Sequence, residues 1–287
     1  MDALGYYNGN WGSLDEMTVS MNDRVCFFGD GVYDAAICHK KTIYRLDRHI
    51  DRFFNSAKLL EITPELSKEK LKTLLNEMTA KVDHDDVLVY WQASRGTGRR
   101  NHAFPEGTSN LYIMIKAASV TNLDKKVKLI TVEDTRFLHC NIKTLNLIPN
   151  VIASQRAKEA DAYEAVFHRG DIVTECAHSN VHILKDGTFI THPADNHILP
   201  GIARGHLVQV CGGLGIPVEE REFTLKELFD ADEVLVSSTS TFGVGADHID
   251  GKPAGGRAPE LLKKIQDEMM ADFHSVTGYD REGDRTL

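Results

Sequence analysis

Residues 140–148 read CNIKTLNLI, and their single lysine, Lys143, stands among apolar and small polar residues. A strand is expected shortly before them, over 127–132, and a helix after them, with Pro149 near its first turn. Because burial disfavours the charged form of a lysine, a buried lysine can act as a neutral amine that attacks carbonyl groups. Lys143 is therefore a candidate Schiff-base residue. On this stretch alone, a lysine with its stem along the core and its head in water is the more common case.

The composition indicates a globular protein of 287 residues, with 42% apolar and 26% charged residues. A net charge of -9 argues against a broad nucleic-acid-binding face, which would be basic. No apolar run has the length of a membrane span, and the N-terminus is unlike a signal peptide. The five cysteines are scattered and form no Cys-x-x-Cys pair, which suits reduced thiols. We therefore expect a cytoplasmic protein without nucleic-acid or membrane partners.

A polar stretch without periodicity, residues 117–126, is a plausible linker between two domains. We expect a small α/β domain over 1–118, a linker over 119–125 and a larger, β-rich domain with helices over 126–277. The charged tail, 278–287, is expected to be disordered. The fold class predicted from these elements is α+β with two domains.

A basic segment, residues 94–105, separates expected strands over 87–93 and 111–115 and is longer than an ordinary hairpin loop. Arg100 and His102 are two positions apart, so in an extended conformation both point to the same side. A guanidinium and an imidazole together make a good carboxylate receptor. The alternative is an exposed loop with incidental arginines.

Two further features precede that loop. A glycine-rich bend at 27–31 leads into a buried strand that carries Tyr33, a residue that could be part of the core. A helix is expected to follow, capped by Asp47, with Arg52 well away from its apolar face. Arg52 then faces either solvent or a ligand.

In the second half, a helix start could bind a phosphate and a run of hydroxyl residues could line a polar site. Glu175 closes an expected strand, and Gly201 directly precedes a helix. The free N–H groups and the dipole at such a helix start can bind phosphate. Five hydroxyl residues, 237–241, follow another buried strand, although a solvated loop would explain them equally simply.

The thirteen histidines include two close pairs, His178/His182 and His192/His197. Neither pair has a recognised zinc spacing, and the sequence places no third ligand beside them. We therefore expect no metal site.

Taken in order, these fragments resemble the fold-type IV family of pyridoxal-phosphate enzymes, and most closely its D-amino-acid aminotransferases. The resemblance covers nearly the whole chain short of the tail. The matching runs are FGDGVY at 28–33, HIDR at 49–52, RGTGRRNH at 95–102, VED at 132–134, IKTLN at 142–146, TE at 174–175, SNV at 179–181, LPGIAR at 199–204 and STS at 238–240.

The resemblance implies a cofactor, pyridoxal 5′-phosphate, and roles for the residues that match. Lys143 would bind the cofactor covalently and move the substrate proton, and Glu175 would face the pyridine nitrogen. The cofactor phosphate would be bound by Arg52, by the N–H groups of Ile202 and Ala203, and by Ser238 and Thr239. The substrate carboxylate would be received by Tyr33, Arg100 and His102, the last two from a partner subunit of a homodimer.

The chain departs from the family at two places. Relatives often have a hydroxyl residue where Ala203 stands, so one phosphate hydrogen bond would be missing. A run that is serine-rich in relatives reads CAHS here, at 176–179. Arg99 adjoins Arg100, and the two-residue spacing to His102 favours Arg100 as the carboxylate ligand.

The expected activity is transamination between D-amino acids and 2-oxo acids. Three rival activities share the fold: those of a branched-chain L-amino-acid aminotransferase, an (R)-amine transaminase and an aminodeoxychorismate lyase. The Arg100-x-His102 pair favours the D-amino-acid group. A non-catalytic binding protein on the same scaffold is the alternative from another class, and the presence of Lys143 and Glu175 argues against it.

Overall fold

A computed structural model describes residues 2–280 and divides the chain into two compact units. The first unit comprises the chain up to Val120, the segment Ile142–Asn146 and the C-terminal part from Phe273. The second comprises Thr121–Asn141 and Leu147–Asp272, so the two units alternate along the chain. The domain limits expected from the sequence stay a prediction. Of the tail expected to be disordered, residues 281–287 lie outside the described part.

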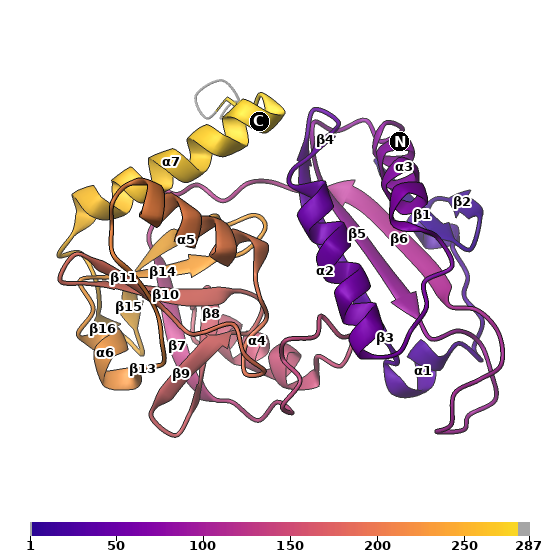
Figure 1. The fold of residues 1–287 in the computed structure, drawn as a ribbon, viewed down its shortest axis with the longest axis horizontal. Coiled ribbons are helices and arrows are strands. Elements are labelled where there is room, and N and C mark those ends of the chain that lie inside the picture. Colours follow the sequence, from indigo (N-terminus) through magenta and orange to yellow (C-terminus); the bar gives the residue numbers. More distant parts are fainter. Residues whose placement is uncertain (1, 281–287) are drawn as a thin grey trace. The chain divides into compact units, whose positions relative to one another are not determined.

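The first unit is built on a six-stranded antiparallel sheet with the order β2-β1-β6-β5-β3-β4. Helix α2 runs along this sheet (Figure 1). The strands are β1 (Ala3–Tyr7), β2 (Asn10–Gly12), β3 (Gly31–His39), β4 (Thr42–Ile43), β5 (Asp86–Ser94) and β6 (Asn110–Ala117). The helices are α1 (Arg24–Phe28), α2 (Leu46–Leu59) and α3 (Lys68–Thr79), with a 3-10 turn at Leu14–Glu16.

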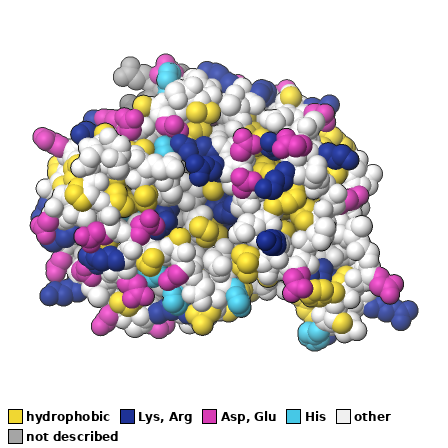
Figure 2. Space-filling model, in the orientation of Figure 1, with side chains coloured by type: hydrophobic (Ala, Val, Ile, Leu, Met, Phe, Trp, Pro, Cys, Tyr) yellow, Lys and Arg dark blue, Asp and Glu magenta, His cyan; other side chains and the backbone are white. Residues whose placement is uncertain are grey.

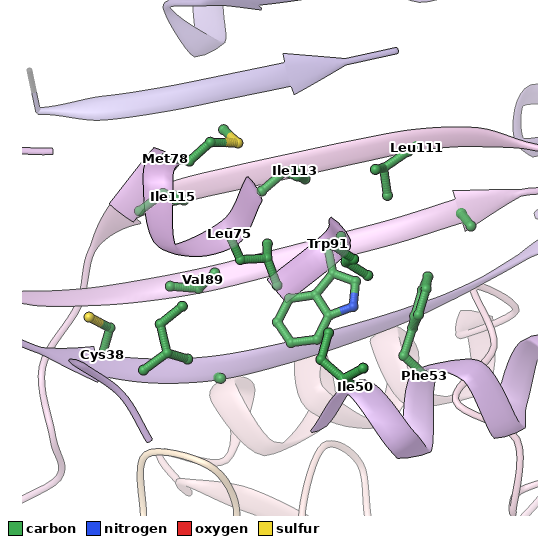
Figure 3. Close-up of a cluster of buried hydrophobic side chains, with 14 of the residues drawn as sticks. Cys38, Ile50, Phe53, Leu75, Met78, Val89, Trp91, Leu111, Ile113 and Ile115 are labelled. Carbon is green, nitrogen blue, oxygen red and sulfur yellow. The ribbon is translucent and has the colours of Figure 1, made fainter. Parts of the chain in front are cut away.

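Strand β5 shows why this sheet has one covered face. Its residues alternate between buried and half-buried, as expected for side chains that point to opposite faces in turn. Trp91 is fully buried, and Ile50 and Phe53 of α2 lie near it together with Leu75 of α3 (Figure 3). Each such side chain contributes about 1.5–3 kcal/mol to stability by leaving water. This cluster therefore holds α2 on the sheet.

Helices α2 and α3 begin in different ways. Ser67 caps α3, and its side chain accepts a hydrogen bond from the Lys70 N–H, as its residue type suggests. Asp47 was expected to cap α2, and that prediction is wrong. The N-cap is Arg45, in a left-handed conformation with φ 52°, while Asp47 lies in the first turn. There its negative charge still interacts favourably with the helix dipole.

The second unit is built on a mixed ten-stranded sheet. Its order is β12-β11-β10-β14-β15-β7-β8-β9-β13, with β16 paired to β15. The strands are β7 (Val127–Glu133), β8 (Glu164–Arg169), β9 (Ile172–Cys176), β10 (Asn180–Lys185), β11 (Thr188–Thr191), β12 (Val218–Glu220), β13 (Phe223–Thr224), β14 (Glu233–Ser237), β15 (Val244–Ile249) and β16 (Lys252–Pro253). Strand β7 confirms the strand expected at 127–132.

Four helices accompany this sheet: α4 (Ile148–Glu159), α5 (Ile202–Gly213), α6 (Leu225–Phe229) and α7 (Pro259–Thr277). Pro149 lies in the first turn of α4, and Thr224 and Glu227 form a capping box at α6. No helix within residues 2–280 is long and apolar enough to cross a membrane. Acidic and basic side chains are interspersed on the face shown in Figure 2, without a broad basic field.

Candidate active site

The segment Ile142–Asn146 lies against the entrance of strand β3. The Tyr33 N–H donates to the Lys143 carbonyl at 2.9 Å, and the Leu145 N–H donates to the Gly31 carbonyl at 3.0 Å. A Cβ atom at Gly31 would lie 2.7 Å from Leu145 Cδ1 and 2.6 Å from a main-chain oxygen of β5. Only glycine permits this close approach, so the glycine-rich bend positions the segment that carries Lys143.

Lys143 is half-buried, and its Nζ lies 4.3 Å from the ring centroid of Tyr33. The Tyr33 ring in turn stacks on Tyr90 at 5.5 Å. Ser56 Oγ accepts a hydrogen bond from the Lys143 N–H at 3.1 Å, which holds the main chain in place. No carboxylate forms an ion pair with Lys143 in the described part of the chain. The amine is thus held over an aromatic face and is not neutralised by an acid.

Arg52 lies on α2 and forms a buried network with two other residues. Its Nε and Nη2 donate to the two carboxylate oxygens of Asp34 at 2.9 and 2.8 Å. His49 Nδ1 lies 2.8 Å from Asp34 Oδ1. Burial alone would raise the pKa of Asp34, but the Arg52 charge and the His49 hydrogen bond hold it well below its usual range. Burial lowers the pKa of His49. The ionised carboxylate of Asp34 therefore fixes the orientation of the Arg52 side chain.

Arg100 and His102 lie in the connection between β5 and β6, and both are exposed. Both contact Phe28 at the end of α1. The Arg100 guanidinium lies 5.4 Å from the Phe28 ring centroid, and the His102 ring lies 5.2 Å from it. One aromatic ring thus brings the two residues of the expected carboxylate receptor together.

Glu175 belongs to the second unit, near the end of β9, and is 5% exposed. Three donors surround its carboxylate. Arg136 Nη1 donates to Oε1 at 2.5 Å, while Asn180 Nδ2 and the Leu199 N–H each donate to Oε2 at 3.0 Å. Three such donors favour the ionised form of the acid. Glu175 can therefore present a fixed negative charge.

Arg136 joins Glu175 to a second acid, Asp134. Its Nε donates to Asp134 Oδ1 at 2.9 Å, and its Nη2 donates to Oδ2 at 2.8 Å. Burial opposes ionisation of Asp134, but the Arg136 hydrogen bonds outweigh it and lower the pKa of that carboxyl. These ion pairs likewise raise the pKa of Arg136 against the effect of its burial. The result is a buried acid–base–acid row ending at Glu175.

Asn180 joins Glu175 to the start of α5. Its Nδ2 donates to Glu175 and to the Leu199 carbonyl, each at 3.0 Å. A Cβ at Gly201 would lie 2.0 Å from Asn180 Oδ1, so glycine is required for contact between the two segments. Gly201 is the N-cap of α5 and has no capping side chain within residues 2–280. The N–H groups of Ile202 and Ala203 in the first turn are therefore suited to an anion.

The hydroxyl run begins beside Asn180, because the sheet register places Asn180 opposite Ser237. Ser238 and Thr239 are half-buried, and Thr241 Oγ1 donates to Ser238 Oγ at 2.9 Å. The second unit thus brings Glu175, the start of α5 and the hydroxyl run to one end of neighbouring strands. The first unit brings Lys143 to Tyr33, and Arg100 to His102.

One group of side chains within residues 2–280 could hold a metal ion: His192, Asp195 and His197. Asp195 is the acidic partner that the sequence did not place. The groups already contact one another or the main chain, since His197 Nδ1 lies 3.3 Å from Asp195 and His192 Nδ1 lies 3.0 Å from the Pro193 carbonyl. We assign no metal there, and the absence of a metal site stays a prediction.

Comparison with known proteins explains this arrangement. A family model described as amino-transferase class IV matches residues 31–249. The chain belongs to the class IV aminotransferases. It is 37% identical over 271 residues to the D-alanine aminotransferase of Listeria monocytogenes serotype 4b, covering 92% of this chain and 94% of that protein. It is 36% identical over 278 residues to the D-alanine aminotransferase of Staphylococcus aureus strain MSSA476, covering 94% and 99%.

Solved structures agree with the fold of this class IV aminotransferase. The T.th. branched-chain amino acid aminotransferase, complexed with N-(5′-phosphopyridoxyl)-L-glutamate, superposes with a TM-score of 0.87. It is 23% identical, and the match covers 97% of this chain and 95% of that one. The enzyme from Escherichia coli superposes with a TM-score of 0.86 at 20% identity, covering 100% and 98%. The fold is therefore that of the two-domain, fold-type IV enzymes.

Membership of the family makes this chain a pyridoxal-phosphate-dependent aminotransferase, and its residues fit that cofactor. The start of α5, with Gly201 and the adjacent hydroxyl run, offers N–H and O–H donors to a phosphate. Glu175 offers a buried negative charge for a pyridine nitrogen. Lys143 offers an amine without an acidic partner among the described residues.

Sequence reasoning missed four residues that hold these side chains in place. Asp34 binds Arg52, and Arg136 and Asn180 bind Glu175. Arg24 binds the main chain of the basic loop at 94–105. Arg136 lies 39 positions from Glu175, and Asp34 lies 18 positions from Arg52. Asp34 directly follows the FGDGVY motif, and Asn180 lies within the SNV motif. Their positions in these motifs could have marked them as site residues. No signal of spacing or composition marked Arg24 or Arg136.

Proposed function

We propose that this aminotransferase exchanges amino groups between D-amino acids, such as D-alanine, and 2-oxo acids, such as 2-oxoglutarate. The observation that carries the proposal is the set of D-alanine aminotransferases that are 36–40% identical to at least 92% of this chain. The cycle has two steps. A D-amino acid leaves its amino group with the enzyme and departs as a 2-oxo acid, and an acceptor 2-oxo acid then takes the group away.

Lys143 would be the base and nucleophile of both steps. Its amine would hold the cofactor covalently between turnovers and, once released, carry the proton to and from the substrate Cα. The bound cofactor supplies an electron sink for the charge left at Cα. The main-chain bonds to Tyr33 and the Ser56 hydroxyl support this role, because they hold the lysine at one place.

Glu175 would stabilise a protonated pyridine nitrogen, which strengthens the electron sink. Arg136 and Asn180 support this role by fixing the carboxylate. The cofactor phosphate would be bound by Arg52, by the N–H groups of Ile202 and Ala203, and by Ser238 and Thr239. Ala203 has no hydroxyl, so its contribution would come from the main chain alone.

The substrate carboxylate would be bound by Tyr33 together with Arg100 and His102, the last two from a partner subunit. We call Arg100 and His102 the carboxylate pair. Their exposure within one chain and their shared contact with Phe28 support this role. The pair also favours D-amino acids over the rival activities of the fold, namely those of branched-chain L-amino-acid aminotransferases, (R)-amine transaminases and aminodeoxychorismate lyases.

The working unit would be a homodimer. Helix α4 buries only Ala153 and Ala157, while Ile148, Val151 and Ile152 are 70%, 60% and 48% exposed. Three large apolar side chains on one exposed helix face are typical of a surface that a second subunit covers. We also propose a cytoplasmic location, which suits the five free cysteines.

Incubation with D- or L-alanine and 2-oxoglutarate tests the proposed function. We expect pyruvate from D-alanine, together with D-glutamate identified by chiral chromatography. Formation of L-glutamate from L-alanine or from branched-chain L-amino acids would contradict the proposal. It would favour the branched-chain alternative.

The carboxylate pair is tested by Arg100→Ala. The loss of a hydrogen bond to a charged group, about 1.5–3 kcal/mol, should lower kcat/KM for D-alanine by roughly 10- to 150-fold. The rate with (R)-1-phenylethylamine, which has no carboxylate, should hold. Arg99→Ala in the same loop serves as the control. An equal loss with both substrates would mean that Arg100 supports the fold or the dimer instead.

A further inference from the structure

The loop that carries the carboxylate pair is built around a buried arginine from another part of the chain. Arg24 is 4% exposed and begins helix α1. Its Nη1 donates to the carbonyl oxygens of Asn101 and Ala103 at 2.6 and 3.1 Å, and its Nη2 donates to that of His102 at 3.4 Å. Three consecutive carbonyls thus converge on one guanidinium.

These three hydrogen bonds connect residues 101–103 of the loop to the rest of the protein. Within the described chain, residues 99–104 form no hydrogen bond with the main chain of another segment. Arg24 itself is held by Asp30, whose Oδ2 accepts from its Nε at 2.7 Å. Arg95, at the start of the connection, also donates to Asp30 at 2.9 Å, so one acid holds both Arg24 and Arg95. The Arg24 guanidinium therefore holds residues 101–103 of the loop in place.

The same guanidinium helps to form the surface on which the carboxylate pair rests. It lies 4.8 Å from the Phe28 ring centroid, the ring that Arg100 and His102 also contact. A cation near an aromatic ring is attracted to the face of that ring. Arg24 therefore fixes Phe28 and the main chain at 101–103 together.

We propose that Arg24 is a positioning residue for substrate recognition, which sets the geometry of Arg100 and His102 without touching the substrate. The inference rests on the proposed function of the carboxylate pair. Arginine is required because its planar fork can donate to three carbonyls and one carboxylate at once, whereas lysine is a single point donor. Loss of Arg24 would leave the pair present but misplaced, so binding of carboxylate substrates would suffer selectively.

The experiment compares Arg24→Lys with Arg100→Ala in the holoenzyme. Arg48→Lys at an exposed position of α2 is the control for the substitution. We expect Arg24→Lys to raise KM for D-alanine about tenfold while kcat changes little. KM for (R)-1-phenylethylamine, which needs no carboxylate contact, should stay within about twofold. The cofactor absorbance band should match that of Arg48→Lys.

Hydrogen exchange gives a readout that does not depend on turnover. Peptides spanning 96–104 should exchange faster in Arg24→Lys, while peptides from β5 should not change. Phe28→Leu, which removes the ring and leaves Arg24 in place, should also raise KM for D-alanine. This second variant keeps the proposal testable if Arg24→Lys does not fold.

The outcomes separate this inference from the proposed function. An unchanged KM for D-alanine in Arg24→Lys, with a large increase in Arg100→Ala, would overturn the inference and leave the carboxylate pair standing. An equal increase in KM for D-alanine and (R)-1-phenylethylamine in Arg24→Lys would also overturn the inference, because it would indicate a general structural role for Arg24. If neither variant affects D-alanine, the proposed function of the pair itself is wrong.

Discussion

Arg136 Nη1 lies 2.5 Å from Glu175 Oε1, and these side chains are only 8% and 7% exposed. An arginine beside the acid proposed to face the cofactor keeps that acid charged at neutral pH, because protonation would break the ion pair. Asp134, on the other side of Arg136, adds a second negative charge, which Arg169 balances at 3.1 Å. The negative charge of Glu175 is therefore a property of a buried row of three groups.

Arg136→Met should destabilise the folded protein by about 3–5 kcal/mol, because it leaves the buried Glu175 without a cationic partner and Asp134 with Arg169 alone. Arg136→Lys should cost less, since it keeps the charge. Urea denaturation of the purified protein measures both. Arg48→Met at an exposed position of α2 is the control. If Arg136→Met were as stable as the control, the row would have no structural role.

Lys143→Ala should lower transamination by several orders of magnitude, because the covalent link to the cofactor and the proton carrier are lost together. Borohydride treatment followed by peptide mass analysis should label Lys143 in the wild type, and no lysine in Lys143→Ala. Lys58→Ala, at an exposed site of α2, should remain labelled at Lys143 and active. Near-normal turnover by Lys143→Ala would show that another group performs the chemistry.

Glu175→Gln should slow the half-reaction with D-alanine more than it weakens cofactor binding. A neutral amide stabilises a protonated ring nitrogen less than a carboxylate does. Rapid-mixing absorbance measurements give the half-reaction rate, and titration of the apoprotein gives the cofactor Kd. Normal rates once the variant is saturated with cofactor would make Glu175 a structural residue.

Gly201→Ala should weaken cofactor binding, because the new Cβ would lie 2.0 Å from Asn180 Oδ1 and force Asn180 away from Glu175 and Leu199. The backbone is not the obstacle, since Gly201 has φ −63°. Gly212→Ala in the same helix meets no atom within 4 Å and should be neutral or stabilising by about 0.5–1 kcal/mol. Equal cofactor affinity in the two variants would contradict the contact.

His182 should make the folded protein less stable in mild acid. Burial, with the nearby charge of Arg204, lowers its pKa to about 3. The unfolded value is about 6.5, so below that pH only the unfolded chain gains the proton, and stability falls by about 1.4 kcal/mol per pH unit. Between pH 6.5 and 5, the free energy of unfolding of His182→Gln should therefore fall by about 1–2 kcal/mol less than that of the wild type. Urea denaturation at both values tests this, and equal losses would mean that other groups dominate.

Local patterns were enough to predict many of the elements, whereas the role proposed for Lys143 came from the resemblance of the whole chain to a family. The strand at 127–132 and the helix that begins with Pro149 in its first turn depend on neighbouring residues. Such interactions are encoded within a few positions, so sequence alone determines them. The start of α2 shows the limit. The turn from β4 requires a left-handed residue, and Arg45 caps the helix in place of Asp47.

Only the tertiary structure decided which charged groups meet. Arg24 contacts carbonyls 77 to 79 positions away, and Arg136 meets an acid 39 positions away. Both are ordinary arginines in the sequence, because neither spacing nor composition says which acid or carbonyl a long side chain will reach. A buried charge must find a partner, and the partner available to it is set by the packing of strands and loops that are distant in the chain.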